Sequence, residues 1–198
     1  MAGMVTDPDA ALMLAFQRGD AAAFRTLYRR HARAMVAFCH HFIRDAARAE
    51  ELAQDVFVKL YRSAHRYTPR ARFRTFLYRV ASNTCLNEVR RTEHGVRETG
   101  DRDGPGDLDR FASPDASPEQ AAEGAALERA VRDLLARLPE KQRAALVLCR
   151  FEGMSYEEIA QVLETTVPAV KSLVHRATVA AAQLLVPERA ARMEEALP

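Results

Sequence analysis

Apolar residues recur every three or four positions along most of this chain, the spacing that places them on one face of an α-helix. One such stripe comprises Phe24, Leu27, Tyr28, His31, Met35 and Phe38. A second stripe comprises Leu52, Val56, Phe57 and Leu60. Each stripe is what a helix shows when one of its faces packs against a core. The pattern predicts an all-α protein.

Residues 154–177 show the same spacing in two shorter segments with a break between them. Ser155 and Glu158 have the spacing of a capping box, so the first helix is expected to begin directly after Ser155. Thr166 can cap a second helix, whose first turn tolerates Pro168 because the N–H groups there need no partner. We interpret the pair as a helix-turn-helix.

The second of these helices would bury Val170, Val174 and Ala177. Its outer side would show Pro168, Ala169, Lys171, Ser172, His175 and Arg176. Short and cationic side chains at a helix N-terminus can approach the major groove of DNA closely. The alternative is an ordinary helical hairpin with a solvated outer face. Glu164 favours that alternative, because such turns usually carry a glycine that can adopt a positive φ.

Charge is distributed unevenly, although the formal net charge of the 198 residues is only +2. Residues 1–91 hold 16 Lys and Arg against 8 Asp and Glu, residues 92–126 hold 3 against 9, and residues 127–198 hold 10 of each. The middle range is rich in glycine, proline and aspartate, so it cannot bury enough apolar surface to order itself. We predict two small helical domains, 1–91 and 127–198, joined by a flexible acidic linker over 92–126. The helix-turn-helix belongs to the C-terminal domain.

The range 66–91 contains seven arginines and one acidic residue, with aromatic residues between them. Arginines alone suit phosphates, whereas aromatic rings suit unpaired bases, which stack on them for about 1–3 kcal/mol each. Asparagine and arginine can also read base edges. The candidate nucleic-acid residues of this range are Arg66, Tyr67, Arg72, Phe73, Arg74, Phe76, Arg79, Asn83, Asn87 and Arg90.

Helical spacing brings four of these candidates into one polar ridge. The ridge consists of Arg79, Asn83, Asn87 and Arg90, opposite the apolar residues Leu77, Val80, Ala81 and Cys85. The alternative interpretation is that Phe73 and Phe76 belong to the core and that the arginines only promote solubility.

The remaining residue patterns exclude several kinds of chemistry. Cys39, Cys85 and Cys149 are odd in number and lie in apolar helical patterns, so we interpret them as reduced core residues and expect no metal or other cofactor. Asp7 and Asp9 stand where a signal peptide would be basic or apolar, and no run of about 18 apolar residues could span a bilayer. We therefore expect a cytoplasmic protein without membrane insertion.

Several sequence motifs follow one another along roughly residues 12 to 186, nearly the whole chain. They are AEELAQDVF at 49–57, RFRTFLYRVASNTCLNEVRR at 72–91, LARLPEKQR, and GMSYEEIAQVL followed by VPAVKSLVHRA. This order resembles the extracytoplasmic-function sigma factors of bacterial RNA polymerase. The resemblance implies that residues 1–91 form the family's domain two, that residues 127–198 form its domain four, and that the linker threads through the polymerase.

The resemblance also assigns roles to the candidate residues. It implies that the basic-aromatic range melts and reads the −10 element and that the helix-turn-helix reads the −35 element. The outward residues of the helix with the second apolar stripe are Glu51, Gln54, Asp55 and Lys59. By default they form a solvated face, but the resemblance implies that they dock on the β′ coiled coil of the polymerase.

The partners implied by the resemblance are core RNA polymerase, through its β′ and β subunits, promoter DNA and an anti-sigma factor. The free protein is expected to be a monomer. Two residues depart from the family pattern: Phe76 replaces a common tryptophan, and Leu173 replaces an arginine of the reading helix.

Two functions of other classes compete with this interpretation. A stand-alone regulator that binds duplex operators would explain residues 154–177, but not the aromatic residues among the arginines. A nucleic-acid enzyme would need a catalytic pattern such as HExxH or GxxxxGK[ST], and the sequence contains neither. We therefore expect a non-enzymatic protein.

Overall fold

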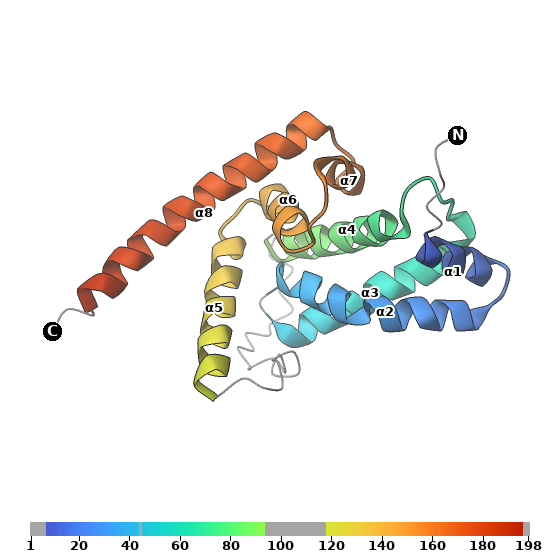
Figure 1. Ribbon diagram of the computed structural model, residues 1–198, viewed down its shortest axis with the longest axis horizontal. Coiled ribbons are helices and arrows are strands. Elements are labelled where there is room, and N and C mark those ends of the chain that lie inside the picture. The colour runs from blue at the N-terminus through green and yellow to red at the C-terminus, as the bar shows by residue number, and fades with distance from the viewer. Residues whose placement is uncertain (1–6, 44, 94–117, 196–198) are drawn as a thin grey trace.

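The computed structural model describes residues 7–43, 45–93 and 118–195. All regular structure in these ranges is helical (Figure 1), which confirms the all-α prediction. The N-terminal unit contains α1 (Pro8–Gln17), α2 (Ala21–His40), α3 (Ala46–Ser63), the short 3₁₀ helix η1 (Ala64–Arg66) and α4 (Phe73–Glu93). The C-terminal unit contains α5 (Pro118–Ala136), α6 (Glu140–Arg150), α7 (Tyr156–Val162) and α8 (Val167–Glu195).

Capping residues explain where several helices begin. Asp7, Asp20 and Asp45 precede α1, α2 and α3, and the side chain of each accepts at least one hydrogen bond from a backbone N–H of the first turn. Ser155 and Glu158 form the predicted capping box, and α7 begins at the next residue. Each such cap satisfies otherwise unpaired N–H groups and contributes about 1 kcal/mol.

The predicted apolar stripes form the core of the N-terminal unit. Leu27, Met35 and Phe38 of α2 are fully buried, as are Val56 and Leu60 of α3. Tyr28 differs from the prediction, because its side chain remains 44% exposed although it packs edge-on against Phe57, with 4.8 Å between the ring centroids.

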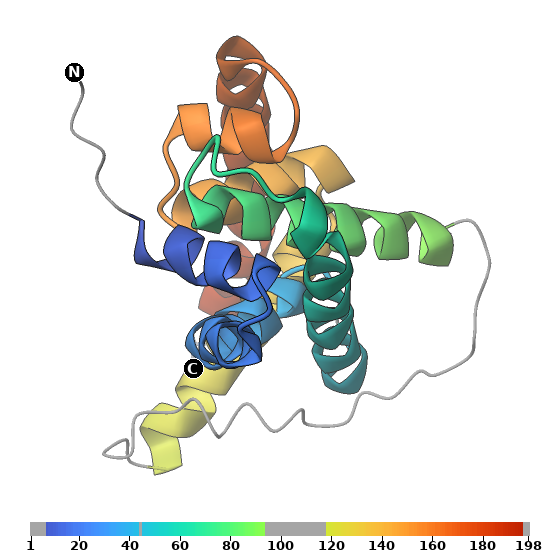
Figure 2. The ribbon, with the colours of Figure 1, turned by 90° about the vertical axis from the view of Figure 1, so that its right-hand side faces the viewer.

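The two units pack against each other, and α4 is the element that joins them. In Figure 1 and in the view turned by 90° in Figure 2, α4 lies between the helices of the N-terminal unit and the pair α6 and α7. Buried apolar residues of both units form one continuous cluster. The sequence predicted two units on a linker and gave no reason to expect this contact.

The boundaries of the predicted linker also change. Helix α4 extends to Glu93 and α5 begins at Pro118, so both ends of the predicted range 92–126 are helical. Residues 94–117 lie outside the described residues, and a flexible linker there remains a prediction.

Candidate nucleic-acid interface

Helix α8 presents the predicted reading face to solvent. Val170, Val174 and Ala177 are buried and hold one side of the helix against the core. The backbone N–H of Ala169 donates to Oγ1 of Thr166 at 3.4 Å, as expected for an N-cap. The exposed residues of the opposite side are Pro168, Lys171, Ser172, His175 and Arg176, with Ala169 half-buried beside them. The structure therefore brings the six predicted residues together.

The turn between α7 and α8 forms without a glycine. Glu164 adopts a φ of 50°, in the left-handed region. A non-glycine residue there costs about 1–2 kcal/mol, because its Cβ approaches a backbone carbonyl. The objection that the missing glycine raised against a helix-turn-helix is therefore wrong, since a glutamate makes the turn instead.

The arginine missing from the family pattern has a structural explanation. Leu173 is half-buried and packs against the apolar core. Its side chain therefore adds apolar contact to the helix-turn-helix and offers no donor to DNA.

The polar ridge of α4 forms as predicted. Asn83, Asn87 and Arg90 are exposed and Arg79 is half-buried. On the opposite side Leu77, Ala81 and Cys85 are fully buried. Helical spacing was sufficient to place these residues because one face of α4 packs on the N-terminal core.

Two aromatic residues of the candidate set, Phe73 and Tyr67, are buried in the structure. The ring of Phe73 is fully buried, with its centroid 5.6 Å from that of His31, and its backbone N–H donates to Oδ2 of Asp7 at 2.6 Å. This burial supports the alternative that Phe73 belongs to the core, and a contact between Phe73 and DNA stays a prediction. Tyr67 is also buried, with only 5% of its surface exposed. This burial raises the pKa of its phenol to about 12.

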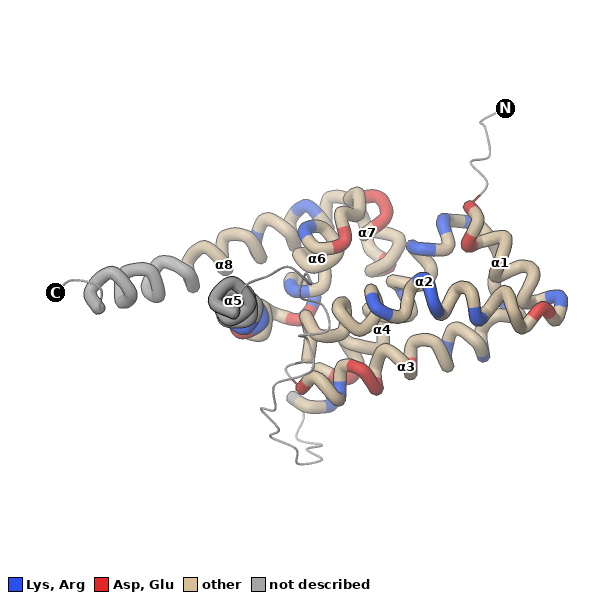
Figure 3. Tube along the Cα trace, turned by 60° about the horizontal axis from the view of Figure 1, so that its bottom comes forward, with Lys and Arg blue, Asp and Glu red and all other residues tan. Residues whose placement is uncertain are grey.

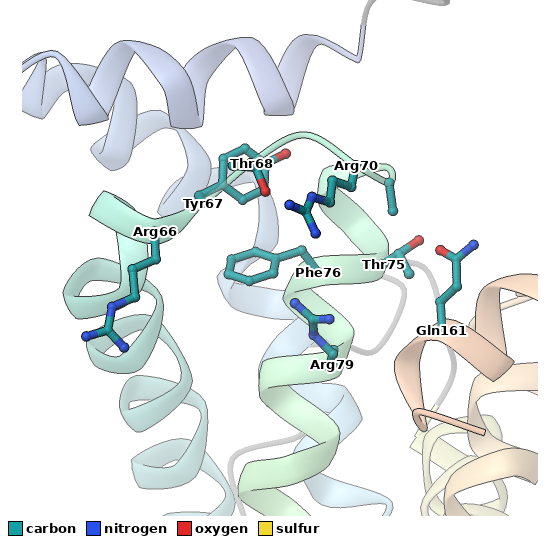
Figure 4. Close-up of a pocket in the computed structure, with 9 residues that line it drawn as sticks. Arg66, Tyr67, Thr68, Arg70, Thr75, Phe76, Arg79 and Gln161 are labelled. Carbon is teal, nitrogen blue, oxygen red and sulfur yellow. The ribbon is translucent and has the colours of Figure 1, made fainter.

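Phe76 and Arg79 instead line a pocket of about 380 Å³ beside the start of α4 (Figure 4). The ring of Phe76 lies 5.1 Å from that of Tyr67 and 5.4 Å from the Arg79 guanidinium carbon, measured to its centroid. Other lining residues are Arg66, Thr68, Arg70, Ala71, Thr75 and Gln161. An aromatic surface with guanidinium groups around it suits a base and its phosphates.

Four arginines of the candidate set face glutamates of the C-terminal unit. The pairs are Arg72–Glu158, Arg74–Glu152, Arg79–Glu164 and Arg90–Glu140, with N–O distances of 4.0, 3.4, 3.9 and 2.5 Å. The Arg74 guanidinium also donates to the backbone carbonyl of Glu152, and the Tyr78 hydroxyl donates to its carboxylate. Burial and this hydrogen bond raise the pKa of Tyr78. The glutamates therefore engage Arg74 and Arg90 by hydrogen bonds, whereas Arg72 and Arg79 lie about 4 Å from theirs and keep exposed side chains.

Sequence reasoning missed two further contacts between the units. Arg143 is only 4% exposed and donates to the backbone carbonyl of Phe42 at 3.1 Å, as well as to carbonyls within its own unit. The ring of His41 lies 4.2 Å from that of Phe151, and burial, followed by the charges of neighbouring residues, lowers the pKa of His41 to about 4. The spacing of apolar residues carries no signal for a buried arginine, so these contacts needed the structure.

The outward face of α3 is exposed at all four predicted positions, Glu51, Gln54, Asp55 and Lys59. Two of these side chains bind neighbours within the unit: Arg48 contacts Glu51 at 2.7 Å, and Lys59 donates to Oγ1 of Thr84 at 3.0 Å. Within the described unit, the face is not covered by another helix, so a partner can reach it.

The thiols have the burial expected of core residues. Cys39 and Cys85 are fully buried with 3.6 Å between their sulfur atoms, and Cys149 is half-buried. The hydrogen bond to Cys39 and burial raise the pKa of the Cys85 thiol. Within the residues described, three or more potential metal ligands do not cluster anywhere. The described helices also include none that is long and apolar enough to cross a membrane.

Two families match the chain, one in each unit. Residues 27–94 match Sigma-70 region 2, and residues 128–179 match Sigma-70, region 4. The RNA polymerase sigma-H factor of Pseudomonas aeruginosa is 33% identical, over 93% of this chain and 97% of its own. The ECF RNA polymerase sigma-E factor of Haemophilus influenzae is 31% identical, over 89% of this chain and 94% of its own.

Solved structures show the same fold. CnrH in complex with the cytosolic domain of CnrY is similar with a TM-score of 0.68 and 25% identity, over 91% of this chain and 99% of that chain. The sigma factor RpoE in complex with the anti-sigma factor NepR from Bartonella quintana has a TM-score of 0.61 and 21% identity, over 82% and 96% of the two chains.

Proposed function

This chain belongs to the extracytoplasmic-function sigma factors, which direct promoter transcription by RNA polymerase, and from that premise we propose how its surfaces divide the task. Helix α8 reads the −35 element as duplex DNA. The pocket and ridge of α4 hold the unpaired bases of the −10 element. Core RNA polymerase binds the exposed face of α3 and brings both DNA surfaces to one promoter.

The geometry of α8 supports its role in reading duplex DNA. Lys171 and Arg176 project from the exposed side of α8, Lys171 in its second turn and Arg176 farther along, and a recognition helix meets base edges with its N-terminal part. Pro168, Ala169 and Ser172 are short, so they allow the helix backbone to approach the groove closely. His175 completes the face, and any of the polar members can donate to phosphate or to a base.

The pocket beside Phe76 is the observation that carries the −10 proposal. Unpaired bases bind proteins by stacking on aromatic rings while cationic groups hold the backbone. Phe76 supplies the ring, and Figure 4 shows Arg70 and Arg79 turned toward it. A reader of duplex DNA alone has no use for such a pocket, because paired bases expose only their edges.

The polymerase contact is proposed for Gln54 and Asp55, together with Glu51 and Lys59. Their side chains are exposed and turned away from the α3 core residues. An acidic and amide face of this kind suits a basic partner surface. We extend to this chain the monomeric, cytoplasmic state and the inhibition by an anti-sigma factor that the family resemblance implies.

A binding experiment on the complex with core polymerase tests the −10 proposal. Phe76→Ala should weaken binding of a single-stranded −10 oligonucleotide by about 1–3 kcal/mol, the worth of one stacked base. Arg29→Ala removes an exposed arginine of α2 and serves as the control, with unchanged affinity expected. Equal affinities for the Phe76 and Arg29 variants would contradict the proposal. Binding of a duplex operator without polymerase would instead favour the stand-alone regulator.

A further inference from the structure

Part of the wall of the pocket beside Phe76 comes from residues 68–72, which we call the pocket loop (Figure 4). The loop is exposed throughout and belongs to no helix. The residues on either side of it, Tyr67 and Phe73, are buried, and their ring centroids lie 6.2 Å apart. The position of the loop relative to the pocket therefore depends on how its two ends are held.

Helix α1 holds the first end of the pocket loop. The side-chain amide of Gln17, the last residue of α1, donates to the backbone carbonyl of Ala64 at 2.6 Å and to that of Tyr67 at 2.8 Å. An amide nitrogen carries two N–H groups, so one side chain can serve both carbonyls. Gln17 thus fixes the backbone directly before the loop.

The start of α1 holds the second end of the loop. Oδ1 of Asp7 accepts from the backbone N–H of Asp9 at 3.0 Å and caps α1. Oδ2 of the same carboxylate accepts from the N–H of Phe73, the first residue of α4, at 2.6 Å. The first N–H groups of a helix have no partner within it, so Asp7 caps two helices at once. Figure 3 shows acidic positions at the start of α1, next to the chain end marked N.

The pocket loop is also stiff between these two ends. The backbone N–H of Arg70 donates to the carbonyl of Thr68 at 2.8 Å, which closes a tight turn around Pro69. The proline ring fixes its own φ and restricts the residue before it. A pocket whose walls are fixed before binding loses less conformational freedom when a ligand enters. The contacts from α1 therefore prepare the pocket for its occupant.

We propose that Gln17 and Asp7 are positioning residues for base selection at this pocket, although neither lines it. They hold the pocket loop where it meets the edge of a base stacked on Phe76. Loss of either contact leaves the ring and the arginines of the pocket in place. It therefore reduces the discrimination between bases more than the binding of the strand. This inference rests on the proposed −10 function of the pocket.

Two substitutions remove the contacts and keep the size of the side chains. Gln17→Met removes both N–H donors. Asp7→Asn leaves one acceptor oxygen, which can cap α1 or accept from Phe73 but cannot do both. The matched controls are Gln183→Met at an exposed position of α8 and Asp20→Asn, whose carboxylate accepts from N–H groups of its own helix.

Trypsin tests the state of the loop without any DNA, because Arg70 and Arg72 are exposed cleavage sites within it. Mass spectrometry of the digested full-length chain gives the rate at each site. Cleavage after these two arginines should be about three- to tenfold faster in both variants than in their controls, the factor that one ordinary hydrogen bond corresponds to. Rates at sites outside the loop should not change.

Complexes with core polymerase then bind single-stranded −10 oligonucleotides in which one base at a time is replaced. The ratio of the affinities for the preferred and the replaced base does not depend on the fraction of active protein, so a loss of stability alone leaves it unchanged. At one position of the element this ratio should fall about three- to tenfold in both variants, again the worth of one hydrogen bond. The controls should keep the ratio of the unmodified chain.

Two results would overturn the inference. Faster cleavage at all sites alike would mean that Gln17 and Asp7 only stabilise the fold. Unchanged base ratios, together with weakened binding by Phe76→Ala, would mean that the pocket holds a base without help from α1. If Phe76→Ala leaves binding unchanged as well, the −10 proposal itself fails, and the positioning role fails with it.

Discussion

The two proposed DNA surfaces of this chain are both basic helix faces, but their surroundings differ. The outer side of α8 projects Lys171 and Arg176 into solvent, whereas α4 has Arg74 and Arg90 in contact with glutamates of the other unit. Under the proposed division, α8 reads paired DNA and the α4 surface is needed only after the strands separate.

The difference extends to the aromatic residues. Near α4, Phe73 is core and Phe76 lines a pocket, although both stand in the same basic run. On the α8 face the six proposed contacts include no phenylalanine, tyrosine or tryptophan. A surface for unpaired bases needs rings supported by a core, whereas a surface for duplex DNA needs short and cationic side chains.

The largest expected effect separates these two phenylalanines. Phe73→Ala should lower the free energy of unfolding by about 3–5 kcal/mol, because a fully buried ring leaves a cavity. Phe76→Ala should cost clearly less, since its ring is only half-buried. Urea denaturation followed by circular dichroism measures both. A stable Phe73→Ala protein with weakened oligonucleotide binding would return Phe73 to the DNA surface.

The second largest effect is expected from acid pH, which should lower the stability of the folded chain through His41 at the contact between the units. Burial lowers the pKa of His41 from 6.5 to about 4, so the unfolded chain binds a proton that the folded chain excludes. This contribution to stability is complete above pH 6.5 and is lost as the pH falls toward 4, by roughly 3 kcal/mol in total.

Denaturation at several pH values checks this linkage. His41→Gln removes the titrating group, so its stability should depend less steeply on pH between 6.5 and 4 than that of the unmodified chain. His40, whose pKa burial also lowers, remains in both proteins. Identical pH slopes would show that His41 is not held neutral beside Phe151.

The exposed side of α8 should show a smaller but specific effect. Lys171→Ala or Arg176→Ala should each weaken −35 duplex binding by about 1–3 kcal/mol for a base contact and by less for a phosphate contact. Stability should hardly change, because both side chains are exposed. Gel shift of the polymerase complex on promoters with altered −35 sequences distinguishes the two kinds of contact. Full affinity of both variants would exclude this face as the reader.

The smallest effect on stability is expected at α3. Gln54→Ala with Asp55→Ala should change the free energy of unfolding by less than about 0.5 kcal/mol, because both side chains are exposed. Binding to core polymerase, measured by pull-down, should nevertheless weaken. If the double variant unfolds instead, these residues are structural and the docking proposal is wrong.

Much of the fold could be predicted because apolar spacing directly reflects burial. The capping box at Ser155, the buried stripe of α8 and the ridge opposite Leu77 all follow from helical periodicity. Position within a helix therefore determined which face of α4 or α8 is exposed. The family resemblance then supplied roles that periodicity could not.

The remainder depends on contacts between segments far apart in the sequence. Glu152 and Arg74 are distant along the chain, and nothing in their local patterns indicates that they meet. Arginine usually lies at the surface, but Arg143 is buried, and its guanidinium donates hydrogen bonds to backbone carbonyl groups. Phe73 and Phe76 are three residues apart in α4, so helical spacing places them near one face and does not show that one ring is fully buried and the other half-buried. A single sequence does not show such pairings.

The central claim is that α4 acts on melted DNA while α8 acts on duplex DNA. Transcription from a promoter with an artificial bubble across the −10 region tests it most directly, alongside the same promoter fully paired. Helix α8 is probed by Lys171→Ala and Arg176→Ala, and α4 by Asn83→Ala and Arg79→Ala. We predict that the bubble restores transcription to the α8 variants and leaves the α4 variants impaired. Equal restoration of both sets, or of neither, would contradict the division.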